Sequence, residues 1–432
     1  MRALLARFVP ALAPTDRPKV TGPADPVMTA CVVALVAFGV VMVFSASAVF
    51  ADSRYDDPFH FFIRQSVFAL AGLGVCFTVA RFDYHGYRRW TYPALAVAVV
   101  LLLMVVLGLG RAAGGAARWI AVGPINIQPA EAAKLALILW LAYSLSKKAD
   151  QIRSFEIGFL PHALVAGMLM LLCLKQPDFG SAVMMGVLTF TLLFTAGARL
   201  GYLLGALAIA APIAFAVVRF SGYRMDRIRA WLEPFEHRYG IGYQIAESLM
   251  SFGAGGATGV GIGDSRQKLL FLPEAHTDFI SAIVGEELGF VGIALLLLAY
   301  VLLVFRGLRA AHQAADDYGA YLAIGITVFL GMQAFTNLAV AMGMLPTKGL
   351  VLPFMSYGGS SLLVNCAAVG ILLNVSRPRE VEELTEEAEA ADAKNVPRKT
   401  REKRAKKTKD GSRGATRGRR KKRMNMRLEG AE

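Results

Sequence analysis

The sequence predicts an all-α polytopic membrane protein with about ten transmembrane helices, and three observations support this fold class. The 432-residue chain is 55% hydrophobic and only 18% charged, a composition typical of proteins that cross a bilayer several times. Several apolar runs reach about 18–25 residues, the length at which a helix spans the hydrocarbon core. Many charged residues lie near the C-terminus, outside these runs.

Ten segments fit the pattern of a membrane-spanning helix. Their approximate bounds are 26–50, 63–80, 92–108, 129–146, 157–174, 179–196, 203–220, 278–305, 318–342 and 356–375. Because the number is even, we expect both termini on one side of the membrane. Lys and Arg are concentrated on that side, as the positive-inside rule requires of the cytoplasmic face; examples are Arg7, Arg88, Lys147 and Arg306.

Composition divides the chain into three parts. A cytoplasmic N-terminal arm covers residues 1–25, a transmembrane domain covers 26–376, and a cytoplasmic tail that we expect to be disordered covers 377–432. The tail is first acidic, "EVEELTEEAEAADA", and then polybasic from Lys394 to Arg427. It holds no aromatic side chain that could stack on bases, so we expect contact with anionic lipid and not with nucleic acid.

Two sizeable loops fall on the opposite, extracytoplasmic side. One covers residues 110–128, and the larger, between the seventh and eighth spans, covers 221–277. The larger loop contains "YRMDRIRAWLEPF", an amphipathic piece with Arg224, Arg227 and Arg229. A basic patch at this interface can hold an anionic group such as a diphosphate. Simple contact with anionic lipid headgroups explains the same residues, and the sequence alone leaves both interpretations open.

The stretch "FLPEAHTDFISAIVGEELGF", residues 271–290, places titratable side chains at and inside the start of the eighth span. Asp278 falls at the outer interface, where partial desolvation raises the pKa of a carboxyl group and suits it to take a proton from a hydroxyl. Glu274 and His276 are nearby alternatives for this base. The competing interpretation of Asp278 is a helix N-terminal charge, possible on dipole grounds alone.

Glu286 and Glu287 lie deeper in the same predicted helix. Carboxylates inside a membrane pair with other groups, line a path or stay protonated. If the helix is regular from Asp278 onward, Glu286 lies a little more than two turns further along and borders the same cavity.

Three further stretches carry polar groups at membrane depth. In "NIQPAEAAKLALIL", Glu131 and Lys134 share one helix face. Two interpretations of Lys134 are open: it contacts Asp278 or a substrate phosphate, or it pairs only with Glu131. In "KQPDFGSA", Asp178 is a helix cap. In "LPTKGLVLPFMSYGGSSLL", Lys348, Ser356 and Ser360 accompany a glycine pair, and irregular backbone at this depth must line a cavity or be buried in protein.

Known sequence motifs exclude some classes of function. The chain has no P-loop, HExxH, GxSxG or CxxC motif. ATP-driven transport and thiol chemistry therefore have no support.

The four stretches together resemble the SEDS family, the shape, elongation, division and sporulation proteins of bacteria. The resembling blocks are "INIQPAEAAKL", "QPDFGSA", "QKLLFLPEAHTDFISAIVGEELGFVG" and "LPTKGLVLPFMSYGGSSLL". The resemblance covers residues 27–377, with the blocks in the family's order and spacing. "LPTKGLVLPFMSYGGSS" favours the division members, because elongation members usually lack the Thr-Lys-Gly.

The resemblance implies a peptidoglycan glycosyltransferase. Such an enzyme joins lipid II units at the outer face of the cytoplasmic (inner) membrane, here during septal wall synthesis. It implies that Asp278 is the essential carboxylate and that Glu131 and Lys134 line the same cavity. It also implies a complex with a class B penicillin-binding protein, a single-span transpeptidase, among other divisome membrane proteins. The basic tail is outside the shared pattern.

The chemistry of this reaction requires a base, cations for a diphosphate and a groove open to lipid. Asp278 is the expected base, and the expected cavity residues are Glu131, Lys134, Arg118, Glu274, His276, Lys348, Ser356, Ser360, Arg224 and Arg227. A divalent cation, Mg²⁺ or Mn²⁺, is a further candidate for the diphosphate, and the sequence assigns it no ligands. The alternatives are a lipid II flippase, an elongation-type polymerase and a non-catalytic scaffold.

Overall fold

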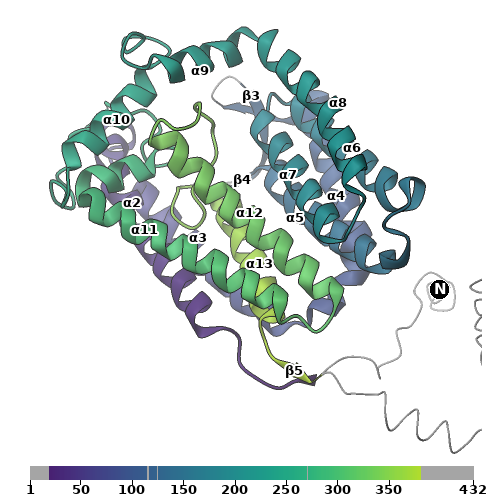
Figure 1. Cartoon of the computed structure of the whole chain (residues 1–432). Helices are drawn as coiled ribbons and strands as arrows, with labels where there is room; N and C mark the ends of the chain where they lie inside the picture. The colour runs from purple at the N-terminus through teal and green to yellow at the C-terminus, as the bar shows by residue number, and fades with distance from the viewer. Residues whose placement is uncertain (1–18, 114–115, 124, 270, 381–432) are drawn as a thin grey trace, which may run out of the picture. The chain divides into compact units, whose positions relative to one another are not determined.

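The computed structural model describes residues 19–113, 116–123, 125–269 and 271–380, and it is mostly helical (Figure 1). The predicted arm up to residue 18 and the polybasic tail from residue 381 lie outside the described residues. The first residues of the predicted tail are described, however. They form β5 (Arg379–Glu380), which pairs antiparallel with β1 (Lys19–Val20).

Ten helices occupy the positions of the ten predicted spans, with starts that differ by at most three residues and ends that differ by at most seven. They are α2 (Pro26–Tyr55), α3 (His60–Arg81), α4 (Thr91–Met104), α5 (Pro129–Lys147), α6 (Leu160–Lys175), α7 (Phe179–Thr195), α8 (Leu200–Arg219), α11 (Ile280–His312), α12 (Asp317–Ala341) and α13 (Gly359–Val375). Short 3-10 and π segments adjoin some of them: η2 (Tyr84–Trp90), η3 (Val105–Leu109), η4 (Ala149–Gln151) and η5 (Phe155–Phe159).

Seven helical segments within the described residues are long and apolar enough to cross a membrane. They are α2, α3, η2–α4–η3, η5–α6, α8, α11 and α12, and shorter apolar helices form α7 and α13. The predicted helical membrane fold is therefore confirmed. The total of ten crossings and the side on which each terminus lies stay predictions.

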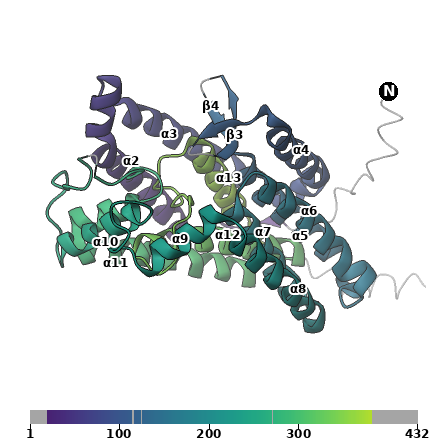
Figure 2. The same cartoon turned by 90° about the horizontal axis from the view of Figure 1, so that it is seen from above.

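The helices pack around two apolar cores. One core joins α2, α3, α11, α12 and α13, and the other is built mainly from α4, α5, α6 and α7. Helix α12 lies between them, and its Tyr321 and Ile324 pack against both. Figures 1 and 2 show α12 and α13 between the purple α2–α3 pair and the blue-to-teal group of α4 to α7. This central position makes α12 a rigid support for the loops at its ends.

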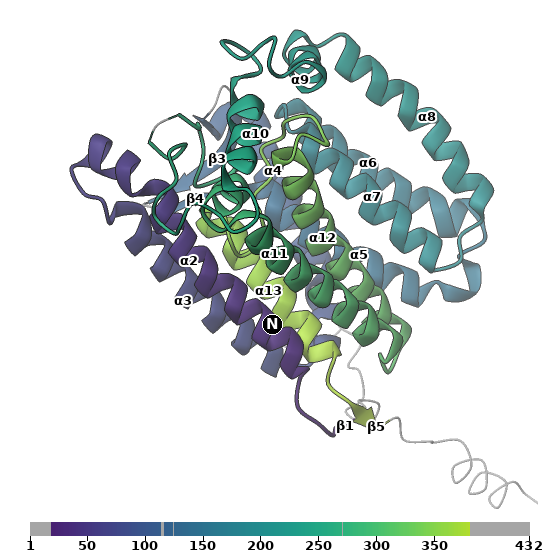
Figure 3. The ribbon, with the colours of Figure 1, turned by 60° about the vertical axis from the view of Figure 1, so that its left-hand side comes forward.

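Both predicted loops contain regular structure. Residues 110–128 form a three-stranded antiparallel sheet of β2 (Arg111–Ala113), β3 (Ala116–Val122) and β4 (Ile125–Ile127). Residues 221–277 contain α9 (Gly222–Leu232), which is the predicted amphipathic piece, and α10 (Tyr243–Gly255). In Figure 3, α9 links α8, which stands beside the bundle, to the region above α12.

The glycine-rich stretch after α10 fits against a break in α11. Gly289 has a left-handed φ of 64°, which interrupts the helix. The freed backbone groups pair with the stretch: Val260 N donates to Glu286 O at 3.0 Å, and Phe290 N donates to Gly256 O at 2.9 Å. A side chain at Gly259 would lie 2.1 Å from Glu287 O, so only glycine permits this close approach.

Glu286 and Glu287 hold the same loop, which corrects the expectation that Glu286 borders the cavity of Asp278. The Glu286 carboxylate accepts hydrogen bonds from Ser265 Oγ at 2.5 Å and Arg266 N at 2.9 Å. The Glu287 carboxylate accepts from Ser45 Oγ at 2.6 Å and Lys268 Nζ at 3.1 Å. The expectation placed both residues on one regular helix, whereas α11 begins only at Ile280 and Asp278 lies in the preceding loop.

Candidate functional site

Asp278 lies in the loop that leads into α11. The helix begins at Ile280 and its cap position is Phe279, so Asp278 is not the N-terminal cap of the helix. Thr277, which precedes Asp278, donates to the Glu274 carboxylate at 2.7 Å. Asp278 is therefore not the capping residue, but it lies directly before the cap position, so the competing interpretation as a charge favoured by the helix dipole stays an alternative.

The surroundings of Asp278 favour its protonated form. Burial among protein atoms raises the pKa of its carboxyl group to about 7, and the nearby Glu274 carboxylate adds to the rise. The guanidinium groups of Arg227 and Arg118 lower the pKa of the same carboxyl group but do not cancel the effect. A carboxylate that titrates close to neutral pH is well matched to the removal of a proton from a hydroxyl.

Asn337 on α12 joins the loop of Asp278 to the loop before α13. Its Nδ2 donates to Asp278 O at 2.8 Å and to Leu350 O at 2.7 Å, and its Oδ1 accepts from Ser281 Oγ at 3.2 Å. A Cβ atom on Gly349 would lie 3.3 Å from Asp278 Oδ2. The amide of Asn337 therefore holds the backbone of Asp278 next to that of Leu350, and the Asp278 carboxylate lies beside Gly349.

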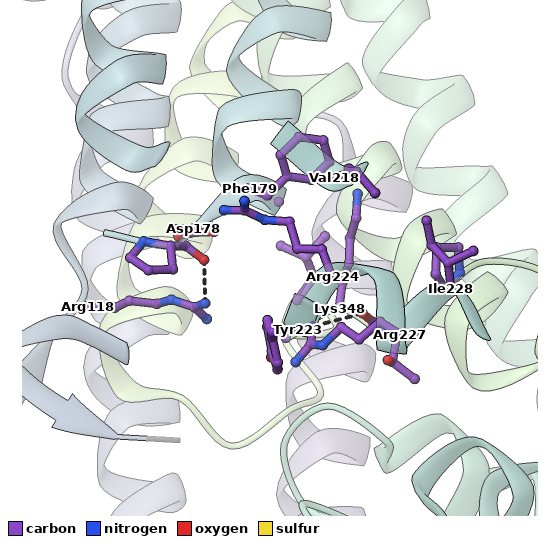
Figure 4. Close-up of a pocket in the computed structure, with 15 residues that line it drawn as sticks. Arg118, Asp178, Phe179, Val218, Tyr223, Arg224, Arg227, Ile228 and Lys348 are labelled. Carbon is purple, nitrogen blue, oxygen red and sulfur yellow. Dashed lines mark hydrogen bonds between the residues drawn. The ribbon is translucent and has the colours of Figure 1, made fainter. Parts of the chain in front are cut away.

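A cavity of about 110 Å³ adjoins this segment; we call it the cationic cavity (Figure 4). It is lined by Arg118, Pro177, Asp178, Phe179, Gly180, Val218, Tyr223, Arg224, Arg227, Ile228 and residues 346–350. Four of these side chains are basic and one, Asp178, is acidic. The cavity therefore suits an anionic group.

The basic side chains of the cationic cavity come from three different parts of the chain and are held by backbone oxygens or aromatic rings. Arg118 on β3 donates to Pro177 O at 2.6 Å, and Arg227 on α9 donates to Thr347 O at 2.8 Å. The Phe179 ring lies 5.7 Å from Arg224 and 5.6 Å from Lys348, within cation–π range. The cations are thus positioned before any ligand binds.

Two neighbours of these cations have structural roles. Asp178 caps α7 by accepting from Ser181 N at 3.0 Å, as predicted. Trp231 on α9 donates to Gly343 O at 2.8 Å and so holds α9 against the loop that follows α12. Burial lowers the pKa of Lys348, and the carboxylate of Asp178 opposes this shift.

A second cavity, of about 270 Å³, lies at the other end of the Asp278 loop. It is lined by Ala46, Phe50, Lys268, Leu272, Pro273, Glu274, Ala275 and His276. Glu274 and His276, both predicted site residues, therefore face a different space from the arginines.

Glu131 and Lys134 form a buried pair on α5. Lys134 Nζ donates to Glu131 Oε1 at 2.7 Å and lies 5.2 Å from the Phe329 ring centre, while Gln333 donates to Glu131 Oε2 at 3.1 Å. The side chains of Lys134 and Glu131 are 0% and 3% exposed. Within the described residues neither lines either cavity. The structure therefore favours the pairing alternative over direct contact with Asp278.

Ser356 and Ser360 also bond to backbone in the structure. Ser356 Oγ accepts from Leu352 N at 2.8 Å, and Ser360 Oγ accepts from Gln128 N at 3.3 Å. Both serines are buried. They stabilise the entry into α13 and do not line the two cavities of the described region.

Asn337 was not among the predicted site residues, although the sequence contains a signal for it. It is an amide inside the apolar run "FLGMQAFTNLAVA", and it is 2% exposed. Buried polar groups need hydrogen-bond partners. Such a residue therefore predicts a specific hydrogen bond, but the sequence does not identify the partner. Among the described residues, no group of three or more His, Cys, Asp or Glu side chains is placed to hold a metal ion.

Comparisons with known proteins find similar sequences over most of the chain. The family described as "Cell cycle protein", which groups FtsW, RodA and SpoVE, matches residues 26–381. This chain belongs to that family, the SEDS proteins. "Probable peptidoglycan glycosyltransferase FtsW" of Trichlorobacter lovleyi is 47% identical over 84% of this chain and 95% of its own length. "Stage V sporulation protein E" of Bacillus subtilis is 42% identical over 79% of this chain and 94% of its own.

Solved structures of SEDS proteins have the same fold. A chain from a study of polymerization and crosslinking by a peptidoglycan synthase complex matches with a TM-score of 0.68 and 31% identity, over 82% of this chain and 98% of that chain. Thermus thermophilus RodA, a rod shape determining protein, matches with a TM-score of 0.62 and 30% identity, over 83% and 98%.

The Asn337 contacts give a first prediction. Asn337→Asp removes the donor shared by the Asp278 and Leu350 carbonyls, and a displacement of about 1 Å at a reacting group costs on the order of 100-fold in rate. We expect kcat for glycan polymerisation to fall by about that factor, while KM changes much less. Ser281→Ala is the matched control, because it removes only the Oδ1 partner, and should cost about threefold or less. Equal losses in the two variants would contradict a positioning role for the Asn337 amide.

Proposed function

We propose that this SEDS protein is an inverting peptidoglycan glycosyltransferase that polymerises lipid II at the outer face of the inner membrane during septal wall synthesis. The single observation that carries the proposal is the placement of the Asp278 carboxylate beside Gly349, at the edge of a cavity that is lined by four basic side chains. The curated relatives that are 47% identical over most of the chain are named probable peptidoglycan glycosyltransferases, which supports the same reaction.

In the proposed mechanism Asp278 acts as general base. Its carboxylate takes the proton from the acceptor sugar hydroxyl while that oxygen attacks the anomeric carbon of the donor sugar. The new C–O bond forms as the bond from the anomeric carbon to the diphosphate breaks, and the undecaprenyl diphosphate leaves with the electron pair. One displacement inverts the α linkage to β, so no covalent enzyme intermediate is needed.

The cationic cavity is the proposed site for the leaving diphosphate. Arg118, Arg224, Arg227 and Lys348 provide positive charge where negative charge develops. An arginine guanidinium can donate two parallel hydrogen bonds to two oxygens of one phosphate. Contacts to backbone oxygens and to the Phe179 ring hold these arginine side chains in place. If a divalent cation takes part, it would supply further charge for the same diphosphate.

The proposed partners are those that membership of the SEDS family implies. We propose a complex with a class B penicillin-binding protein and with other divisome membrane proteins. The matched chain from a peptidoglycan synthase complex that coordinates polymerization and crosslinking supports a transpeptidase partner. The polybasic tail, outside the described residues, has no role in the proposed reaction.

The flippase alternative has less support from the structure. A flippase would need a polar path through the membrane, for which Glu286, Glu287 and Lys134 are the candidate residues. In the described part of the chain Glu286 and Glu287 bind the glycine-rich loop, and Lys134 binds Glu131. These groups are engaged in structural contacts.

One assay separates the alternatives. The purified protein, with its class B partner, is reconstituted in liposomes with fluorescent lipid II, and both glycan strands and transbilayer movement of lipid are measured. We expect glycan polymer. Lipid movement without polymer would indicate a flippase, and the absence of both would indicate a scaffold; either result would contradict the proposal.

A further inference from the structure

The second cavity differs in character from the cationic cavity. Its walls are mainly apolar and aromatic, from Ala46, Phe50, Leu272 and Pro273, with polar groups from Glu274 and His276. Its volume of about 270 Å³ is close to the lower end of the roughly 300–1,000 Å³ found for small-molecule pockets. The cavity therefore suits one compact polar ligand such as a single sugar ring.

The charges around the second cavity disfavour a diphosphate. Lys268 is its one basic side chain within the described residues, and the Nζ of Lys268 already binds Glu287 Oε1 at 3.1 Å and Ser45 Oγ at 3.3 Å. Glu274 adds a carboxylate with no basic partner among the described residues. A neutral ligand with hydroxyl groups fits this balance better than an anion does.

His276 is held so that its ring faces this cavity. Its ring centre lies 4.7 Å from that of Phe61, 5.7 Å from Phe50 and 5.8 Å from Tyr357, and Tyr357 N donates to His276 O at 2.9 Å. Within the described residues the ring nitrogens have no hydrogen-bond partner. Burial lowers the pKa of His276, which favours the neutral ring. A neutral imidazole can both donate to and accept from hydroxyl groups.

Glu274 is set in an unusual backbone conformation beside it. Its φ is +56°, a left-handed value that a residue other than glycine rarely adopts. One carboxylate oxygen accepts from Thr277 Oγ1 at 2.7 Å, which leaves the other free to accept a hydroxyl. Strained conformations of this kind concentrate at binding sites.

We infer that the second cavity binds the acceptor sugar, with Glu274 and His276 hydrogen-bonding its hydroxyl groups while the reacting hydroxyl faces Asp278. This inference rests on the proposed polymerase function and assigns the donor and the acceptor to separate binding sites. The donor diphosphate occupies the cationic cavity, the acceptor sugar occupies the second cavity, and the loop from Glu274 to Asp278 connects the acceptor cavity to the base.

The test uses two lipid II analogues, one that can react only as the donor and one that can react only as the acceptor. A donor-only analogue has its acceptor hydroxyl methylated, and an acceptor-only analogue has a non-leaving alkyl group in place of the diphosphate. The protein in complex with its class B partner then makes a single coupling, and mass spectrometry of the product gives a separate KM for each analogue.

The decisive variant is His276→Phe, which keeps an aromatic ring against Phe50, Phe61 and Tyr357 but removes the ring nitrogens. We expect the acceptor KM to rise about tenfold or more and the donor KM to stay within about twofold. Glu274→Gln, at an exposed side chain, should raise the acceptor KM in the same direction. Arg224→Gln should show the reverse, a higher donor KM.

His60→Phe is the matched control, because His60 stacks on Tyr55 at 4.1 Å on the same side of the protein and lies outside the cavity. Both KM values should stay unchanged in it. Two results would overturn this site alone, provided that the wild type couples the analogues. One is an acceptor KM that is unchanged in His276→Phe and Glu274→Gln, and the other is a rise in the donor KM in these variants. Failure of the wild type to couple the analogues would overturn the proposed function as well.

Discussion

Asp278→Asn is expected to lower lipid II polymerisation by about a thousand-fold or more, because a well-placed general base contributes on the order of 10²–10⁴ in rate and an asparagine amide cannot take the proton. The substitution keeps the backbone oxygen that Asn337 binds. The protein should therefore still insert, remain folded and bind its class B partner. Glycan synthesis by the purified complex, with thermal unfolding of the same samples, measures both effects.

Asp264→Asn is the matched control for this experiment. Asp264 is an exposed carboxylate in the glycine-rich stretch of the same loop region, and its neutralisation should change the rate by about twofold or less. A variant Asp278→Asn that polymerises within tenfold of the wild type would remove Asp278 from the chemistry. Loss of the folded protein would return Asp278 to a structural role.

The second large effect is on stability. Lys134→Met leaves the buried Glu131 carboxylate without its cation, and breaking a buried pair in this way costs about 3–5 kcal/mol. Both side chains are at most 3% exposed, so little water can replace the lost partner. A large fall in the unfolding temperature of Lys134→Met in detergent is the expected result.

The double variant Lys134→Met with Glu131→Gln distinguishes a structural pair from a substrate contact. Replacing both charges with neutral groups of similar size is often nearly neutral for stability, and the amide oxygen introduced at position 131 could still accept from Gln333. We expect the double variant to recover both stability and most of the polymerisation rate. Recovered stability with a lost rate would instead show that Lys134 acts on the substrate.

Much of the fold was predictable because its helices are encoded locally. Apolar runs indicated ten segments, and ten helices occupy their positions. The break in α11 was not predictable, because it exists only where the glycine-rich stretch supplies backbone partners to Glu286 and Phe290. The small sheet of residues 110–128 was also missed, because two of its three strands have only three residues each and β2 contains no residue with a strong strand preference.

The site was predictable in its members but not in its arrangement. The motifs pointed to Asp278, and the basic patch pointed to Arg224 and Arg227, which the structure places in one cavity with Arg118 and Lys348. The separation of Glu274 and His276 into a second cavity depends on how α2 packs against the loop. Likewise, only the tertiary contacts reveal that Asn337 joins two loops.

The most direct test of the central claim is the pH dependence of kcat in three proteins at saturating lipid II. Because the ionised Asp278 is the active form, the wild-type rate should rise with pH and level off above a midpoint near 7, the value to which burial raises the pKa of Asp278. Arg227→Gln removes a cation that lowers the pKa of Asp278, so its midpoint should move up. Glu274→Gln removes a carboxylate that raises the pKa of Asp278, so its midpoint should move down. A rate that is flat across neutral pH, or a midpoint that neither substitution moves, would contradict Asp278 as the base.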